Sequence, residues 1–367
     1  MAIRQPHRFV GPTLSPYSHP LRDGGEMSKK VVIHGTGLMG ASIGLGLVDA
    51  GWEVFGWDPD PAAVAMSLKR GAISRALESP TADLDNADVL VLAGPPSATI
   101  DSLGDLDTDA VVTDIASVKR PVVEAGAGLR RFVPGHPMAG SASSGADHAS
   151  AHLFHGATWV LCDDTAGKED IDLVKGMVSN LGASPVVMSS AEHDERVALV
   201  SHLPRLLASV LIEMAEQNPE ALHLSAGSFR DLTRVAGSEA GWWTDVFMAN
   251  QKAMAVTINQ LQGLLERWKL DIAAGDRASI NDRLEQTREA RAGFGPSVAA
   301  VRVILYDRPG EIGLVGRALE QSEVDLRDLQ IRHAEYGGGG VLTLSVAAAE
   351  AAALKKALAD NGFEIEE

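Results

Sequence analysis

Two short polar segments, each following an apolar run, carry the side chains best suited to acid–base chemistry. Residues 113–119 read TDIASVK and residues 135–141 read GHPMAGS. Imidazole is the side chain that most readily accepts a hydroxyl proton near neutral pH, so His136 is a candidate base, and Ser117 could orient the imidazole or the hydroxyl. The residues alone leave an alternative equally open, in which His136 is a turn histidine and Ser117 a helix N-cap.

Arginines form a second candidate group, in a chain whose formal net charge is −17 at pH 7. That charge disfavours nucleic acid and membranes as partners, because both are repelled. The segment FRDLTR still places Arg230 and Arg234 one helical turn apart, and Arg205 follows SHLP. Guanidinium groups bind carboxylates through paired hydrogen bonds, which favours a carboxylate substrate. The alternative is that these arginines only pair with Asp231 or Asp194 on the surface.

A glycine-rich turn follows the first strong strand pattern. The strand VVIH runs into GTGLMGASIG, which has G-x-G-x-x-G spacing. Such glycines allow a tight turn, backbone approach to a pyrophosphate, and close helix–strand packing. Asp58 ends the next strand, where a carboxylate accepts hydrogen bonds from a ribose diol and repels a 2′-phosphate. The pattern predicts NAD as cofactor, rather than NADP, with contacts from these residues: Gly35, Gly37, Leu38, Met39, Gly40 and Asp58. Plain turn glycines and a turn-capping aspartate are the alternative.

The elements that must position these residues alternate between strand-like and helical segments over residues 30–188. The strand-like runs are KVVIHG, EVFGWD, DVLVLAG, AVVTDIAS, RFVPGH, TWVLC and SPVVMS. We expect a doubly wound α/β fold of the Rossmann type, with a mostly parallel sheet covered on both faces. Carboxyl ends of such strands share one crevice, which would bring His136, Ser117 and Asp114 near the nicotinamide. The rigid loop at Gly94 and Pro95 is expected to cover the nicotinamide half of the cofactor, although it also fits a simple turn.

The remaining sequence predicts three further regions. Residues 1–27 are rich in Pro, Gly and Ser and lack the apolar core of a signal peptide, so we expect a disordered extension, with Met27 as a possible working start. The dinucleotide-binding domain is predicted over 28–188, and a helical domain over 189–297. The helical domain opens on a capping box from Ser189 to Glu192 and has a kink or restart at Pro204. Residues 290–300 resemble a linker, and 300–367 spell a ferredoxin-like β-α-β-β-α-β unit.

Composition indicates the cellular setting. Cys162 is the only cysteine, which excludes an internal disulfide and suits a reducing compartment. No uncharged apolar run of about 18 residues is present, so we expect a cytoplasmic protein without a membrane span. The helical domain is apolar enough that we expect a homodimer through it, with a packed monomeric bundle as the alternative. The sequence gives no candidate metal site.

Taken together and in order, these motifs resemble those of prephenate/arogenate dehydrogenases. The resemblance covers about 30–297, and it rests on GTGLMGASIG, TDIASVK, GHPMAGS with SG at 144–145, HDERVALVSHLP and GSFRDLTRVAGS. It implies NAD-dependent oxidation of the prephenate ring hydroxyl with loss of CO2, giving 4-hydroxyphenylpyruvate for tyrosine biosynthesis.

The resemblance also implies residue roles. His136 matches the family's catalytic base, Ser117 the serine that assists it, and Arg234 the arginine that holds a substrate carboxylate. His193 and His202 match two histidines of the helical segment, for which helix packing is an equally good reading. Together with Arg230, these are the expected substrate-binding residues. The family often reads SHLPH where this chain has Arg205, and the added fixed charge is expected to favour prephenate over arogenate, whose side chain carries an ammonium group.

Residues 300–367 are similar to ACT domains, which bind amino acids. The segment DRPGEIG matches their ligand loop and supplies the expected regulatory residues Asp307, Pro309, Gly310 and Ile312. The resemblance implies feedback by an aromatic amino acid, with a dimerisation module that has lost its ligand as the alternative.

Three other activities compete with the main hypothesis. An arogenate dehydrogenase would give tyrosine directly and differs only in substrate. A 3-hydroxy-acid dehydrogenase would use a lysine such as Lys252, but GHPMAG and FRDLTR do not belong to its pattern. A non-catalytic NAD-linked amino-acid sensor would bind NAD without turning over prephenate, and the intact His136, Ser117 and Arg234 argue against it.

Overall fold

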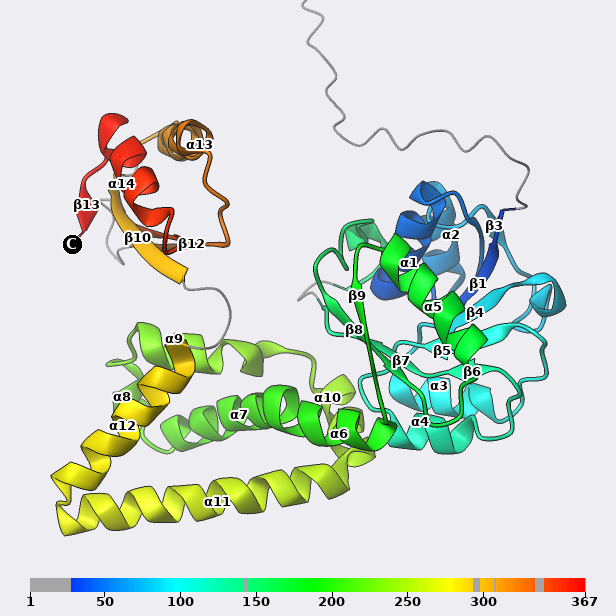
Figure 1. Cartoon of the computed structure of the whole chain (residues 1–367), viewed down its shortest axis with the longest axis horizontal. Coiled ribbons are helices and arrows are strands. Elements are labelled where there is room, and N and C mark those ends of the chain that lie inside the picture. Colours follow the sequence, from blue (N-terminus) through cyan, green and yellow to red (C-terminus); the bar gives the residue numbers. More distant parts are fainter. Residues whose placement is uncertain (1–27, 141–143, 293–297, 307, 334–339, 367) are drawn as a thin grey trace, which may run out of the picture. The chain divides into compact units, whose positions relative to one another are not determined.

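The computed structural model describes residues 28–140, 144–292, 298–306, 308–333 and 340–366 (Figure 1). The chain divides into two compact units at Leu261/Gln262. The expected N-terminal extension, Ser141 of GHPMAGS, residues 293–297 of the linker and Asp307 lie outside the described residues.

The first unit is built on a six-stranded, entirely parallel sheet of order β3-β2-β1-β4-β5-β6. Its strands are β1 (Lys30–His34), β2 (Glu53–Trp57), β3 (Arg75–Ala76), β4 (Val89–Leu92), β5 (Val111–Asp114) and β6 (Phe132–Val133). Side chains alternate between two buried clusters, with Val31 and Ile33 in one and Val32 in the other. Both faces are therefore covered, and the predicted Rossmann-type fold is confirmed.

Helices connect these strands, as in βαβ units. They are α1 (Leu38–Asp49), α2 (Pro61–Lys69), η1 (Leu84–Asn86), α3 (Pro96–Leu103) and α4 (Arg120–Ala125). Two further helices, η2 (Ala146–His148) and α5 (Lys168–Asn180), come after β6 in the chain. The short strand β3 was not anticipated, because only its two residues Arg75 and Ala76 pair with β2.

The run RFVPGH does not form one strand. It divides at Pro134 into β6 and β7 (Gly135–Pro137), and β7 belongs to a separate three-stranded sheet with β8 (Thr158–Cys162) and β9 (Ser184–Met188). Proline has no N–H to continue a ladder, while the Pro134 carbonyl accepts a hydrogen bond from Cys162 N at 2.8 Å. His136 therefore lies within a strand, rather than in a loop after one.

A long helical stretch follows β9 and supplies part of the site. It comprises α6 (Ser190–Val197), one π-type turn η3 (Ala198–His202) and α7 (Leu203–Glu216). The predicted capping box of Ser189 and Glu192 is present. Pro204 does not break the helix. Since it has no N–H to donate, the ladder widens just before it, and Leu203 N bonds to Ala198 O.

The stretch Ser190–Glu216 is, among the described residues, the one helix long and apolar enough to cross a membrane on length and composition alone. A core helix of a soluble protein has the same properties, and this one carries buried charged and polar residues, among them Asp194 and Arg205.

Further helices complete the helical region. They are α8 (Pro219–Leu222), α9 (Gly227–Thr233), η4 (Arg234–Gly237), α10 (Ala240–Ala249), α11 (Gln251–Ala274) and α12 (Arg277–Ala292).

The C-terminal part folds as the predicted β-α-β-β-α-β unit. Its elements are β10 (Val298–Leu305), α13 (Glu311–Ser322), β11 (Asp328–His333), β12 (Gly340–Ala347), α14 (Ala351–Asp360) and β13 (Ile365–Glu366). The strands form an antiparallel sheet of order β11-β12-β10-β13. Residues such as Val301, Val303 and Leu344 form a core with apolar residues of α13 and α14.

Candidate active site

The glycine turn between β1 and α1 has the geometry of a phosphate cradle. Gly35 has φ +92°, a conformation that side chains rarely adopt, and a Cβ on Gly40 would lie 1.8 Å from Gly35 O. A Cβ on Gly37, in contrast, would meet no heavy atom of the described residues within 4 Å. The first amides of α1 have no acceptor inside the helix, so open space at Gly37 lets an anion reach them.

Asp58 stands beside this turn, immediately after β2. Its carboxylate accepts hydrogen bonds from Thr36 N at 2.6 Å and from Asp60 N at 2.9 Å. These bonds fix the carboxylate next to the glycine turn and leave lone pairs for a ribose diol.

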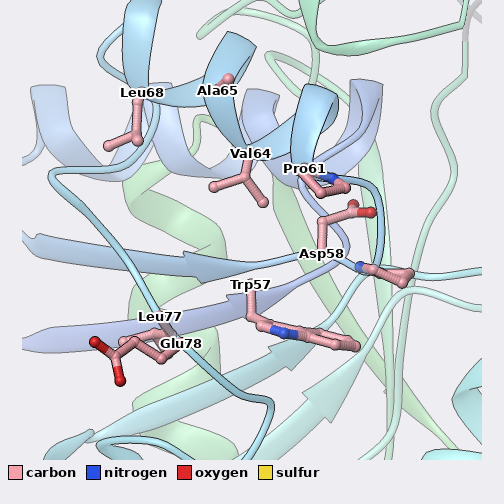
Figure 2. A pocket seen from close by; sticks show the side chains of 9 residues that line it. Trp57, Asp58, Pro61, Val64, Ala65, Leu68, Leu77 and Glu78 are labelled. Atoms are coloured by element: carbon pink, nitrogen blue, oxygen red, sulfur yellow. The ribbon is translucent and has the colours of Figure 1, made fainter.

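A cavity of about 430 Å³ opens at Asp58 (Figure 2). Most of its walls are apolar: Trp57, Pro59, Pro61, Val64, Ala65, Leu68 and Leu77. Such walls next to a ribose-binding carboxylate suit the adenosine half of NAD, so the residues present fit the cofactor. Apart from Trp57 next to Asp58, no feature of the sequence predicted this cavity.

The loop after β4 runs along the glycine turn. Ala93 N donates to His34 O at 2.6 Å, and a Cβ on Gly35 would lie 2.7 Å from the Ala93 carbonyl. Gly94 is half-buried, Pro95 is exposed, and α3 begins directly after them.

The two polar segments singled out from the sequence are tied together by a buried ion pair. Asp114 accepts hydrogen bonds from Gly135 N at 3.1 Å and Ala116 N at 2.8 Å, and it pairs with Lys119 Nζ. Lys119 Nζ also donates to Gly135 O at 2.6 Å. Both side chains are fully buried. Asp114 therefore holds the residue before His136 in place, instead of facing the substrate as its position suggested, and Lys119 was missed.

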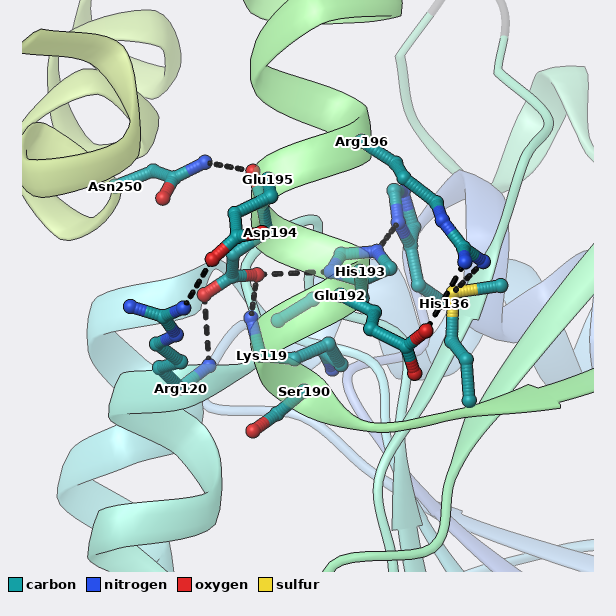
Figure 3. A network of polar contacts seen from close by, with 12 residues as sticks. Lys119, Arg120, His136, Ser190, Glu192, His193, Asp194, Glu195, Arg196 and Asn250 are labelled. Carbon is teal, nitrogen blue, oxygen red and sulfur yellow. Dashed lines mark hydrogen bonds and ion pairs between the residues drawn. The ribbon is translucent and has the colours of Figure 1, made fainter. Parts of the chain in front are cut away.

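His136 is the first member of a chain of polar contacts (Figure 3). Its Nδ1 lies 2.8 Å from His193 Nε2, and His193 Nδ1 lies 2.8 Å from Asp194 Oδ1. Asp194 in turn accepts hydrogen bonds from Lys119 N at 2.7 Å and Arg120 N at 2.9 Å. The carboxylate of Asp194 thus links α6 to the start of α4, and both ring nitrogens of His193 are occupied.

His202 lies on the same helical stretch, at the end of the π-type turn. Its Nδ1 lies 3.2 Å from Asn250 Nδ2, which also donates to Asp194 O at 2.8 Å. The His202 ring packs edge-on against Trp243. Asn250 and Trp243, both unnoticed in the sequence, therefore join α10 to α6.

Burial keeps these histidines neutral. The pKa of His136 falls well below its usual value, because the ring is desolvated and faces His193, Lys119 and His202. Burial also lowers the pKa of His193 despite its bond to Asp194, and it lowers the pKa of His202 to about 4. Burial alone would raise the pKa of Asp194, but hydrogen bonds from His193, Arg120 and Lys119 outweigh it and lower that pKa. A neutral His136 is in the protonation state required of a base.

Ser117 is buried, and its Oγ has no hydrogen-bond partner among the described residues. Helix α4 begins at Arg120 with Lys119 as its N-cap, so Ser117 is not a helix cap. A buried hydroxyl without a partner is rare in folded proteins and fits a group that bonds a ligand.

The three arginines differ in their surroundings. Arg230 in α9 and Arg234 at the start of η4 are both exposed. Arg205 is buried: its guanidinium bonds to Ser209 Oγ and to Ser238 O and lies 5.6 Å from the centre of the Trp243 ring.

Among the described residues, no group of three or more His, Cys, Asp or Glu side chains could hold a metal ion. Lys252, the lysine of the 3-hydroxy-acid dehydrogenase hypothesis, is exposed.

Comparison with known proteins identifies the family. Residues 43–187 match the nucleotide-binding domain of prephenate dehydrogenase, and residues 189–286 match its dimerization domain. The prephenate dehydrogenase of Lactococcus lactis is 34% identical over 279 residues, which cover 72% of this chain and 77% of that protein. The chain belongs to the prephenate dehydrogenase family.

Further proteins are similar to this chain in sequence or in fold. The Bacillus subtilis enzyme is 25% identical over 343 residues, covering 87% of this chain and 92% of that protein. The structure of Aquifex aeolicus prephenate dehydrogenase with hydroxyphenyl propionate and NAD+ matches with a TM-score of 0.68 and 27% identity, covering 74% of this chain and all of that one. Synechocystis arogenate dehydrogenase matches with a TM-score of 0.65 and 26% identity, covering 72% of this chain and all of that one.

The resemblance inferred from the motifs is therefore confirmed, and this member of the prephenate dehydrogenase family is an NAD-dependent oxidoreductase.

Proposed function

We propose that the chain catalyses the oxidative decarboxylation of prephenate to 4-hydroxyphenylpyruvate in tyrosine biosynthesis, with His136 as the base. The observation that carries this proposal is the orientation of His136. Its Nδ1 is bound to His193, and its Nε2 makes no hydrogen bond within the described residues. One nitrogen is thus anchored while the other is left for a substrate hydroxyl.

The proposed reaction needs one residue, His136, to hold a proton for part of the cycle. Bound NAD supplies the hydride acceptor for the ring carbon that carries the hydroxyl. His136 Nε2 takes the hydroxyl proton as that carbon becomes a carbonyl, and the ring carboxylate then leaves as CO2 with its bonding electrons entering the ring. The ring becomes aromatic, and His136 returns its proton to the phenolate oxygen, so no net proton is gained or lost. Ser117 Oγ, unpartnered in the described structure, is the hydroxyl that assists by bonding the same oxygen.

The arginines are assigned to the substrate carboxylates. Arg234 holds one carboxylate with Arg230 on the preceding turn, because an exposed guanidinium can pair with it in bidentate fashion. Arg205 adds fixed positive charge near the Trp243 ring, against which His202 also packs, and this charge favours the keto-acid side chain of prephenate over the ammonium-bearing side chain of arogenate.

The test of substrate is direct. NADH formation at about 340 nm is followed with prephenate and then with arogenate. Turnover of prephenate supports the proposal; turnover of arogenate alone makes the chain an arogenate dehydrogenase, and turnover of neither, with NAD still bound, leaves the sensor hypothesis. Arg205→His is then compared with the wild type, and an unchanged ratio of kcat/KM for the two substrates would remove the selectivity role of Arg205.

A homodimer in the cytoplasm is the expected assembly. The helical region exposes large apolar side chains, among them Leu199, Val200, Met214, Leu224 and Leu232. Exposed apolar groups of this size are typical of subunit interfaces. Sedimentation velocity should give a mass near twice 38.6 kDa, and a monomer at micromolar concentration would contradict the proposal.

The C-terminal unit is proposed to be an ACT domain that mediates feedback by tyrosine or phenylalanine. Gly310 has φ +94° at the start of α13, and Pro309 and Ile312 are exposed beside it. This backbone leaves room for a ligand at the loop, since a Cβ on Gly310 would meet no described heavy atom within 4 Å. Isothermal titration with both amino acids tests the proposal, and absence of binding would favour a module without ligand.

A further inference from the structure

In the row of hydrogen bonds from His136 through His193 to Asp194, each bond has only one possible donor. Asp194 Oδ1 accepts from Lys119 N at 2.7 Å and lies 2.8 Å from His193 Nδ1. A carboxylate surrounded by N–H donors accepts only, so His193 must carry its proton on Nδ1. A neutral imidazole has one N–H, which leaves His193 Nε2 as an acceptor.

The same logic passes to the next ring. His136 Nδ1 lies 2.8 Å from that accepting His193 Nε2, so His136 must carry its proton on Nδ1. Its Nε2 then has a free lone pair, which is the tautomer that accepts a hydroxyl proton. In the opposite tautomer His136 would present an N–H to the substrate and could not act as a base.

We propose that Asp194 is a positioning residue that, acting through His193, fixes the tautomer of His136; the proposal rests on the role of His136 as the base. Asp194 touches neither His136 nor the predicted cofactor turn, and its effect is carried by the ring between them.

The structure fixes Asp194 in three ways. Backbone amides of Lys119 and Arg120 hold its two oxygens, its own carbonyl accepts from Asn250, and the side chain is buried. The carboxylate cannot rotate without breaking its two hydrogen bonds from backbone amides. The donor and acceptor of each hydrogen bond from Asp194 to His136 are therefore set before substrate binds. When His136 takes a proton, its Nδ1–H bond to His193 strengthens, and the anionic end of the chain stabilises the imidazolium.

Asp194→Asn tests this proposal. An amide NH2 at the Oδ1 position faces His193 Nδ1 and Lys119 N, so His193 loses its acceptor. An NH2 at the Oδ2 position instead faces Arg120 N and breaks the bond that orients the side chain. We expect kcat with prephenate to fall roughly 10–10³-fold, while KM for prephenate and Kd for NAD stay within about threefold. His193→Asn should lose a similar factor, and the double variant should lose no more than either single one, because the residues act as one unit.

A matched control is Asp164→Asn. Asp164 is also a carboxylate that accepts from the first residue of a helix, in this case from Ser190 N and Ser190 Oγ at 2.8 Å each, but no hydrogen bond among the described residues joins it to either histidine. This variant should lower stability and leave kcat within about twofold of wild type. A fall in kcat as large as that of Asp194→Asn would reduce Asp194 to a helix anchor and overturn the proposal.

Histidine ¹⁵N NMR of the NAD-free protein gives a second readout, independent of turnover. The wild type should show His136 protonated on Nδ1, and Asp194→Asn should shift it toward protonation on Nε2. If His136 stays protonated on Nδ1 in the variant, Asp194 does not fix its tautomer and the proposal is refuted. If the wild type shows the expected tautomer but does not turn over prephenate, the proposed reaction is refuted, while the role of Asp194 in fixing the tautomer of His136 still stands. If Asp194→Asn does not fold, His193→Asn carries the same test, because it breaks the chain while Asp194 stays in place.

Discussion

The surroundings of His136 and those of Arg234 are opposite in character. His136, His193, Asp194 and Lys119 meet where β7, α6 and the start of α4 come together, and each has defined partners. Arg234 lies at the junction of α9 and η4 and is exposed. Proton transfer requires an aimed, desolvated group, whereas an exposed cation can adjust to a carboxylate as it arrives. The expected effects of substitutions therefore differ: kcat in the first region and KM in the second.

The largest effect is expected for His136→Asn. The amide cannot accept the hydroxyl proton, so kcat should fall about 10²–10⁴-fold while NAD affinity is retained. Steady-state kinetics and NAD titration measure the two quantities. His148→Asn is the control, since His148 is exposed and, among the described residues, its contacts are with the nearby Ser144 O and Asp147. A near-normal kcat in His136→Asn would show that His136, and with it His193 and Asp194, takes no part in the proton transfer.

Lys119→Met should cost stability. It leaves Asp114 buried without its cation, and breaking such a pair costs about 3–5 kcal/mol. Urea denaturation gives the free energy of unfolding. The comparison is Arg288→Met, which breaks an exposed pair with Glu285 and should leave the free energy of unfolding close to that of the wild type. Equal losses in the two variants would contradict the structural role given to Lys119.

Arg234→Lys should raise KM for prephenate roughly 10–10²-fold with kcat changed less than about threefold, because a lysine cannot form the paired hydrogen bonds. Arg196→Lys, at an exposed arginine that pairs with Glu192, is the control. If kcat falls instead and KM stays constant, Arg234 acts in the chemical step as His136 does. The expected difference between the two regions, kcat in one and KM in the other, would then be wrong.

The smallest effect is a pH dependence of stability. Burial lowers the pKa of His34 and of His202 to about 4 in the folded chain. Between about pH 6.5 and pH 4 the unfolded state binds more protons, so the free energy of unfolding falls as pH falls, by roughly 1–3 kcal/mol for each histidine. Urea denaturation at a series of pH values should show this slope, reduced in His34→Gln; a flat profile would argue against the burial of these rings.

Local patterns were predictable wherever a short-range rule fixes the structure. The capping box at Ser189, the glycine turn at Gly35 and the β-α-β-β-α-β order after residue 298 all follow from neighbouring residues. The switch between sheets at Pro134 was not predicted, because an apolar run with one proline also describes an edge strand. Asp114 was placed facing the substrate because the ends of parallel strands share a crevice, a rule that says nothing about which carboxylate is already bonded.

The sequence by itself determined the nucleotide-binding turn, the two polar segments and the family, because each rests on residue type and spacing along the chain. Only the tertiary structure decided which groups complete the site. His193 and Asp194 lie 57 and 58 positions after His136, and no periodicity connects a strand of one sheet with a helix beyond it. Their contact depends on where β7, α4 and α6 pack against each other. That packing buries Asp194, which the sequence offered only as a surface partner for an arginine, and makes it the residue that sets which nitrogen of His136 faces the substrate.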